Sequence, residues 1–141
     1  MKPLVEIQNL VKYFDLGGNQ RVHAVDDVSL SINPREIVGL VGESGSGKST
    51  LGKTVLGLHD KTDGNVSFAG QVLPQRYRAS DFRAMAPKMQ MIFQDPYSSL
   101  NPRMTVGEIV GEGLRLQPEL SASDVQDRVA HWLKLVGLSP D

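Results

Sequence analysis

Hydrophobic and polar positions alternate in two stretches near the start of the chain. Val5 and Ile7 alternate with polar residues, and the alternation returns at Val28 and Ile32 after a glycine-rich break at 17–19. Successive side chains of a strand point to opposite faces, so this pattern predicts two half-buried strands joined by a turn. We expect an antiparallel β layer to open the fold.

The next two hydrophobic segments are continuous rather than alternating. Residues 37–41 read Ile-Val-Gly-Leu-Val and follow a turn signal at 33–36. A short uninterrupted hydrophobic run is typical of a strand covered on both faces, so 37–41 is predicted to be a core strand. The segment 89–93 is a second strand candidate.

Helical spacing begins after residues 42–49, which are glycine and serine with one glutamate and one lysine. Leu51, Val55 and Leu58 recur at the helical period, so the predicted order is strand, glycine loop, helix. Residues 66–68 alternate and predict a short strand that rejoins the β layer. The arginine-rich segment 74–88 has no clear period and predicts a loop with one helical turn.

Two further helices carry start signals of the capping-box type. The pairs Thr105 with Glu108 and Ser123 with Gln126 have the required spacing. The second helix is expected to bury a stripe made of Val125, Val129, Trp132, Leu133 and Val136, and to end at Gly137.

Composition removes several classes of protein. The 141 residues hold 15 Lys plus Arg against 16 Asp plus Glu, a net charge of -1, so no broad positive field is available for nucleic acid or an anionic membrane. The chain has no cysteine, which excludes disulfide scaffolds, thiolate nucleophiles and iron–sulfur sites. His23, His59 and His131 are isolated and are expected to face solvent rather than to bind a metal.

The glycine loop carries the clearest chemical motif. Residues 42–49, Gly-Glu-Ser-Gly-Ser-Gly-Lys-Ser, match G-x-x-x-x-G-K-[ST] at every fixed position, between a hydrophobic run and a helix. Glycines allow backbone N–H groups to curl around a phosphate, and the helix that follows adds its N-terminal amides. Lys48 would reach the β- and γ-phosphates, and the Ser49 hydroxyl would ligate Mg²⁺.

Two alternatives compete with this interpretation. A dinucleotide-binding fingerprint would need a third glycine where Thr50 stands, so dinucleotide binding is disfavoured. Asp95 follows a hydrophobic run and resembles the metal-binding aspartate of a Walker B strand, but Gln94 interrupts the run. That assignment of Asp95 would suit another P-loop enzyme, such as a kinase.

Residues 41–50 and 92–103 together resemble a known family. Val-Gly-Glu-Ser-Gly-Ser-Gly-Lys-Ser-Thr and the later Ile-Phe-Gln-Asp-Pro-Tyr-Ser-Ser-Leu-Asn-Pro-Arg look like the ATP-binding cassette (ABC) subunits of oligopeptide, dipeptide and nickel importers. The resemblance runs the whole length of the chain. It implies an α/β P-loop NTPase fold of the ABC ATPase type.

The resemblance also divides the fold into parts. Residues 4–33 and 63–73 would form an antiparallel β subdomain that covers the base, beside a partial RecA-like core. Residues 104–137 would begin the helical subdomain. We expect residues 1–141 to be one partial nucleotide-binding domain whose C-terminal half is missing, because the family's signature sequence, Walker B pair and switch histidine are not found.

The family's site residues carry over onto matching positions. Gln94 would be the Q-loop glutamine, acting with Lys48 in catalysis and with Ser49 in binding Mg²⁺. The family stacks adenine on an aromatic residue four positions after a strand leucine, which places Phe14 there with Tyr13 adjacent, and either ring could serve. The residues expected to contact ATP in the loop are Gly42, Glu43, Ser44, Gly45, Ser46, Gly47, Lys48, Ser49 and Thr50.

The implied function is transport-coupled ATP hydrolysis at the cytoplasmic face of the cell membrane. The expected partners are transmembrane permease subunits, a second ATP-binding subunit and, indirectly, an extracytoplasmic solute-binding protein, with no nucleic acid. The 141 residues are expected to bind Mg-ATP without turning it over. A non-catalytic nucleotide-binding or regulatory module remains an alternative.

Overall fold

The computed structural model describes residues 2–95, 97, 99–115, 117 and 119–140. Its contacts divide the chain into two compact units, Met1–Met91 and Ile92–Asp141. The first unit holds a β sheet and two helices, and the second holds two helices. Among the described residues, no helix has both the length and the hydrophobicity needed to cross a bilayer.

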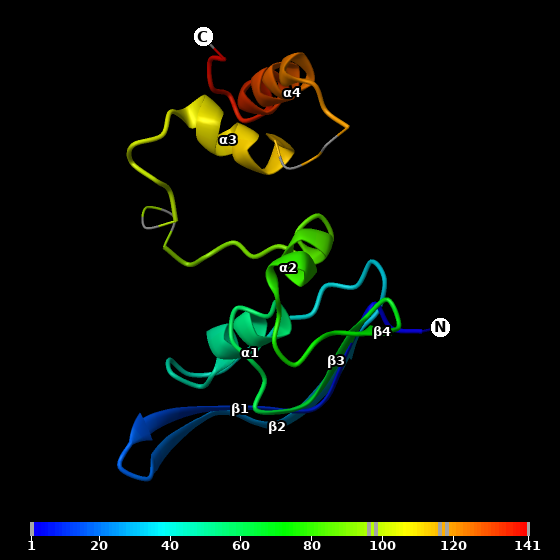
Figure 1. Cartoon of the computed structure of the whole chain (residues 1–141), viewed down its shortest axis with the longest axis vertical. Coiled ribbons are helices and arrows are strands. Elements are labelled where there is room, and N and C mark those ends of the chain that lie inside the picture. The colour runs from blue at the N-terminus through cyan, green and yellow to red at the C-terminus, as the bar shows by residue number, and fades with distance from the viewer. Residues whose placement is uncertain (1, 96, 98, 116, 118, 141) are drawn as a thin grey trace. The chain divides into compact units, whose positions relative to one another are not determined.

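The sheet of the first unit is antiparallel, as the alternation predicts. Its strand order is β2-β1-β3-β4, with β1 paired to both β2 and β3 (Figure 1). The predicted turn lies between β1 and β2, where Gly17, Gly18 and Asn19 have positive φ angles of 86°, 58° and 62°. The strands are β1 (Val5–Gly17), β2 (Gln20–Ile32), β3 (Asp63–Phe68) and β4 (Gln71–Val72).

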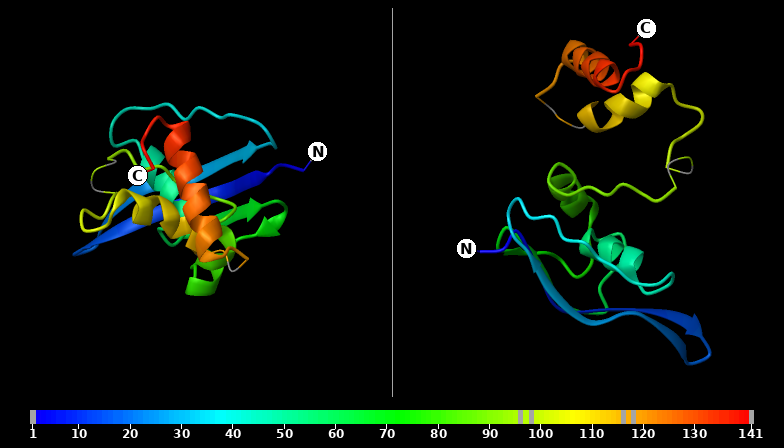
Figure 2. Two further views of the ribbon diagram at one scale, coloured as in Figure 1. Left: turned by 90° about the horizontal axis from the view of Figure 1, so that it is seen from above. Right: turned by 180° about the vertical axis from the view of Figure 1, so that it is seen from behind.

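Helix α1 (Lys48–Val55) packs against one face of this sheet (Figure 2). Leu51 of α1 joins a buried cluster with β-strand residues, and Leu10 and Val66 are almost completely inaccessible. Full burial of one such aliphatic side chain is worth about 1.5–3 kcal/mol. The cluster consists of Ile7, Leu10, Val25, Leu51, Val66 and Leu73. It fixes α1, and therefore the loop before it, against β1 and β2.

Helix α2 (Ala79–Met85) follows β4 and gives the 74–88 segment about two helical turns. It begins after Arg78, whose backbone N–H donates to Asp81 at 2.7 Å, so the capping pair compensates for the weak hydrophobic period. Tyr77 before the helix and Met85 at its end pack at the margin of the buried cluster. The segment is therefore more helical than the predicted loop with one helical turn.

The core strand predicted at 37–41 and the strand candidate at 89–93 are both wrong as secondary structure. Neither segment enters the described sheet, and Ile37, Val41 and Ile92 are 97%, 95% and 96% exposed. A hydrophobic strand is stable only where neighbouring strands complete its backbone hydrogen bonds and cover its faces. No described segment provides those neighbours, so the hydrophobic pattern alone does not produce a strand.

The second unit is a helical pair, α3 (Val106–Arg115) and α4 (Ala122–Leu135). Val125, Val129 and Leu133 of α4 are buried against α3, where Gly111 leaves room for the two valines. Trp132 and Val136 are 50% and 68% exposed, so their predicted places in the buried stripe are wrong. Trp132 lies one position beside the buried i, i+4, i+8 stripe, which three aliphatic residues already fill, and Val136 is the C-cap residue of α4.

The capping boxes of this unit are confirmed for α3 and displaced for α4. Thr105 and Glu108 bond reciprocally as predicted. Helix α4 begins two residues earlier than expected, because Ser121 pairs with Asp124 rather than Ser123 with Gln126. A carboxylate accepts more strongly than an amide at the positive end of a helix, which favours the earlier start.

Candidate functional site

The predicted phosphate loop leads directly into α1 and leaves the start of that helix open. Gly47 is the N-cap residue with φ 90°, and no side chain caps the helix. The first helical hydrogen bond runs from the Leu51 N–H to the Gly47 carbonyl at 2.8 Å. The backbone amides of the first turn therefore have no partner within the helix, and the helix dipole adds positive potential at this point. These amides can bind an anion.

Lys48 folds its side chain back over the same loop. Its ammonium donates to the carbonyls of Gly42 and Glu43 at 2.7 and 2.6 Å and to the Ser46 hydroxyl at 3.1 Å. These three acceptors hold the cationic group over the ring of backbone formed by the loop. The charge and the free helix amides thus lie together, which is the arrangement a polyphosphate requires.

Ser49 and Thr50, which follow Lys48, differ in exposure. Ser49 is exposed in the first turn of α1, so its hydroxyl can reach a bound ion. Thr50 is half-buried, and its carbonyl accepts from the Thr54 hydroxyl at 2.7 Å. Among the described residues, no group of three or more histidine, aspartate or glutamate side chains can hold a metal ion.

Strand β2 supports the loop through a single close approach at Gly47. A Cβ atom at this position would overlap the backbone carbonyl of Ala24, and Gly47 also has a positive φ. Glycine is required here on both grounds. At Gly45, with φ 82°, the space around a Cβ would be open, so glycine serves only the backbone conformation. At Gly42 a Cβ would lie 2.7 Å from the Ser46 Oγ.

Tyr13 is fixed by two side chains of β2. Its hydroxyl donates to the Asp26 carboxylate, and its ring stacks on His23 with centroids 3.9 Å apart. The same carboxylate lies 3.6 Å from His23 Nδ1. The hydrogen bond to Asp26 raises the pKa of Tyr13 above its usual value. Both aromatic rings belong to the cross-strand pair that joins Tyr13 to His23.

Phe14 has different neighbours from Tyr13. The Lys12 ammonium lies 4.6 Å from its ring centroid, and His59 meets it edge to face at 5.2 Å. His59 is half-buried, so its predicted exposure is wrong, whereas His23 and His131 are exposed. Burial lowers the pKa of His59, and the charges of Lys12 and Lys53 lower it further.

Gln94 and Asp95 lie in the second unit and are both exposed. The Asp95 carboxylate accepts from the Tyr97 N–H at 3.0 Å, and its carbonyl accepts from the Ser99 hydroxyl at 2.6 Å. Pro96 of the second motif lies outside the described residues. The Q-loop role of Gln94 and the competing metal-ligand role of Asp95 stay predictions.

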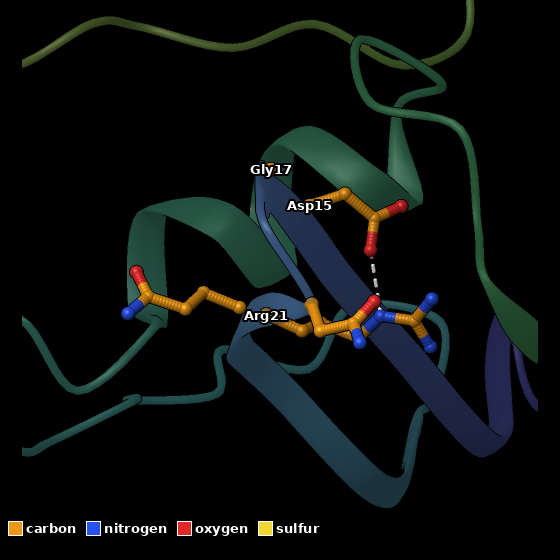
Figure 3. A pocket seen from close by; sticks show the side chains of 5 residues that line it. Asp15, Gly17 and Arg21 are labelled. Carbon is orange, nitrogen blue, oxygen red and sulfur yellow. Dashed lines mark hydrogen bonds and ion pairs between the residues drawn. The ribbon is translucent and has the colours of Figure 1, made fainter.

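A separate pocket of about 490 Å³ lies at the tip of the β1–β2 hairpin (Figure 3). Asp15, Gly17 and Arg21 line it, and Arg21 Nε pairs with Asp15 Oδ1 at 2.7 Å. The pair bridges the two strands next to the Gly17 turn. Since both side chains are largely exposed, it stabilises the hairpin only weakly.

Sequence reasoning missed three residues of this region, all on β2. Ala24 contacts the loop, and His23 and Asp26 contact Tyr13. Ala24 carries no chemical signal of its own. The adjacent acidic residues Asp26 and Asp27 interrupt the hydrophobic alternation of β2, and such an interruption is a sign of a β-bulge.

Comparison with known proteins supports the family resemblance. The family model described as ABC transporter matches residues 25–141. An oligopeptide transport ATP-binding protein, OppF, of Salmonella typhimurium is 44% identical over 149 residues, covering 99% of this chain and 44% of its own length. OppF of Bacillus subtilis is also 44% identical, with 98% and 45% covered. The chain thus spans less than half the length of these relatives.

Solved structures agree with the fold class. The ATP-binding cassette MJ0796, in a dimeric post-hydrolysis state bound to ADP and Pi, has a TM-score of 0.83 and 26% identity, covering 96% of this chain and 58% of that one. The structure of cbiO1 from Clostridium perfringens has a TM-score of 0.74 over 98% of this chain and 52% of that one, at 22% identity, and shows the fold alone. The predicted fold class is confirmed.

Proposed function

Because the chain belongs to the ABC transporter family, we propose that it forms the nucleotide-binding part of a subunit that powers the import of oligopeptides or related small solutes. The relatives named oligopeptide transport ATP-binding proteins support this choice of solute. In the complete subunit, ATP binding and hydrolysis would be coupled to transport.

One observation carries the proposal, namely the convergence of charge and free amides at the start of α1. Lys48 is held over the loop by the carbonyls of Gly42 and Glu43, next to a helix start without a side-chain cap. Phosphate oxygens of the nucleotide would replace those two carbonyls as acceptors of the hydrogen bonds from the Lys48 ammonium. A charge-assisted hydrogen bond of this kind contributes about 1.5–3 kcal/mol.

Magnesium would be held between the nucleotide and two side chains of the protein. Ser49 offers an exposed hydroxyl in the first turn of α1. By the resemblance to the family, the neutral amide oxygen of Gln94 would also ligate Mg²⁺ and orient water in the hydrolytic step, where Lys48 would stabilise the charge on the phosphate. Bound Mg²⁺ would supply electrostatic stabilisation of the transferring phosphoryl group.

The nucleobase would stack on Tyr13 rather than on Phe14. The cross-strand partner of Tyr13 is His23, which directly precedes the Ala24 carbonyl that abuts Gly47. Phe14 contacts His59, four residues beyond the end of α1. An eight-residue helix is about 12 Å long, so His59 marks the end of α1 that is remote from the loop. The position of Tyr13 suits a base whose phosphates lie at Gly47.

The partners follow from the proposed role. Permease subunits would receive the energy of ATP binding, a second ATP-binding subunit, identical or different, would complete the assembly, and a solute-binding protein outside the cell would deliver cargo. The location would be peripheral, at the cytoplasmic face of the membrane. The dimeric state of MJ0796 is consistent with a paired arrangement.

Calorimetric titration of the chain with ATP in the presence of magnesium tests the proposal. Wild-type protein is expected to bind, and Lys48→Ala to bind about 10- to 150-fold more weakly, the equivalent of about 1.5–3 kcal/mol. Lys53→Ala is the matched control, since it removes the lysine of the last turn of the same helix. Equal affinity of wild type and Lys48→Ala would contradict the proposed site.

A further inference from the structure

The aromatic platform beside the loop contains a second ring that no motif predicts. His23 on β2 is the cross-strand partner of Tyr13 on β1. Their ring centroids are 3.9 Å apart and the ring planes differ by 20°. Stacked rings at this separation are in full contact, so one face of Tyr13 is covered by the imidazole. A further planar group would therefore have to stack on the opposite face of Tyr13.

Asp26 contacts both Tyr13 and His23. One carboxylate oxygen accepts from the Tyr13 hydroxyl, and the other lies 3.6 Å from His23 Nδ1. The hydroxyl bond prevents the Tyr13 ring from swinging away, and the histidine contact holds the imidazole parallel to it. The guanidinium of Arg21, with its carbon 6.0 Å from the Tyr13 ring centroid, is instead engaged by Asp15.

A β-bulge is needed to place Asp26 in this position. In a regular strand, residues three apart such as His23 and Asp26 point to opposite faces. Here Leu10 pairs with Val28 and Lys12 with Val25, so β2 has one residue more than β1 between these pairs. The extra residue re-aims the side chains, and Asp27 takes a positive φ of 51°. Bulges of this kind are frequent next to functional sites.

A second register shift connects the same strand to the phosphate loop. Lys12 pairs with Val25 and Tyr13 with His23, which leaves Ala24 without a cross-strand partner. Ala24 is the residue whose carbonyl abuts Gly47. His23, which stacks on Tyr13, and Ala24, which contacts the loop, are therefore adjacent residues of β2. One peptide unit thus links the support of the ring pair to the support of the loop.

We propose that His23 and Asp26 are positioning residues that hold Tyr13 as a platform for the nucleobase, with the base stacking on the face of Tyr13 opposite His23. The inference rests on the proposed nucleotide-binding function and adds two residues to it. His23 acts by stacking and Asp26 by hydrogen bonding, so neither needs to touch the base. Both should affect recognition of the base and leave recognition of the phosphates unchanged.

Titration with two probes separates these contributions. ATP presents both base and phosphates, whereas inorganic tripolyphosphate presents phosphates alone, and magnesium is kept equal. We expect His23→Ala and Asp26→Ala each to weaken ATP about three- to tenfold, the range that an aromatic pair is worth, with tripolyphosphate affinity unchanged. His23→Phe, which keeps a ring, should restore most of the ATP affinity, and Asp26→Asn, which keeps an acceptor, should restore part of it.

The matched control is His131→Ala, which removes an exposed histidine that also contacts an aromatic ring, Trp132, in the second unit. It should leave both affinities unchanged. Equal loss of ATP and tripolyphosphate in His23→Ala and His23→Phe would overturn the inference, because it would indicate a general structural role. Unchanged ATP affinity in His23→Ala would also overturn it. Wild-type protein that binds neither probe would overturn the proposed function itself, and this inference with it.

Discussion

Gly47 and Ala24 are in backbone contact, with no room between them for a single methyl group. The carbonyl of Ala24 on β2 occupies the space that a Cβ on Gly47 would fill, and Gly47 holds φ at 90°. The sheet thereby fixes the point where the loop turns into α1. A substitution at either residue should therefore displace the backbone amides at the start of α1.

Gly47→Ala should therefore both destabilise the first unit and abolish ATP binding. The left-handed conformation costs about 1–2 kcal/mol for a residue with a Cβ, and the clash with Ala24 adds about 1–3 kcal/mol, as overpacking does. Gly45→Ala is the matched control, because its φ is 82° but its surroundings are open. Urea unfolding should show the larger loss for Gly47→Ala. Equal losses in the two variants would show that the contact with Ala24 carries no energy.

Removing Tyr13 and removing Phe14, the two candidate rings for base stacking, should have different effects on the affinity for ATP. Tyr13→Ala is expected to weaken ATP binding by about 1–3 kcal/mol, the usual worth of a stacked base, whereas Phe14→Ala should leave it nearly unchanged. Tyr13→Phe keeps the ring and loses the bond to Asp26, so its affinity should fall between wild type and Tyr13→Ala. A fluorescent ATP analogue can report all three affinities. A greater loss in Phe14→Ala than in Tyr13→Ala would reverse the assignment.

The sequence predicts most of the first unit because its signals are local. Period-two alternation in β1 and β2 and the glycines at 17–18 locate the hairpin, and the motif at 42–49 locates the start of α1. The segment 37–41 shows the limit of such signals. Its hydrophobic run indicates that a strand at this place could be covered on both faces. Whether the strand forms depends on neighbouring strands from distant parts of the sequence, which complete its backbone hydrogen bonds.

The site follows the same division between local and distant signals. Lys48 and Ser49 are predicted by spacing, since the loop and helix that position them are continuous in sequence. Ala24, His23 and Asp26 are brought to the site by register shifts between β1 and β2. Register is set by pairing and packing over the whole hairpin. A local sequence pattern therefore does not predict which side chains the register brings to the site.

Phosphate release should distinguish nucleotide binding from turnover. We expect the 141 residues to bind Mg-ATP without releasing phosphate in the steady state, since the family's Walker B aspartate and the catalytic glutamate beside it are not found among them. A chain extended to the length of its relatives should release phosphate, and Lys48→Ala in that longer chain should not. Turnover by the 141 residues would contradict the need for the missing carboxylate. Loss of magnesium-dependent turnover in Asp95→Asn, equal to that in Lys48→Ala, would instead favour Asp95 as the metal ligand.

The second unit should lose stability in acid because of its helix caps. Hydrogen bonds from Ser121 lower the pKa of Asp124, and those from Thr105 lower the pKa of Glu108. A carboxyl whose pKa is lower in the folded state stabilises the fold above its unfolded pKa, and this contribution is lost as pH falls through the folded value. The free energy of unfolding should thus decline from about pH 5 towards pH 2. Trp132, the single tryptophan, lies on α4 and can report the transition by fluorescence.

Asp124→Asn isolates the contribution of one of these caps. The asparagine keeps an acceptor oxygen for the Ser121 N–H but has no charge to titrate, so the acid-dependent loss should become smaller while stability at neutral pH declines. Asp127→Asn, an exposed position on the same helix outside the cap, should keep the wild-type acid dependence. If Asp124→Asn and wild type lose the same free energy between pH 5 and pH 3, the Ser121–Asp124 bond does not hold the start of α4 in solution.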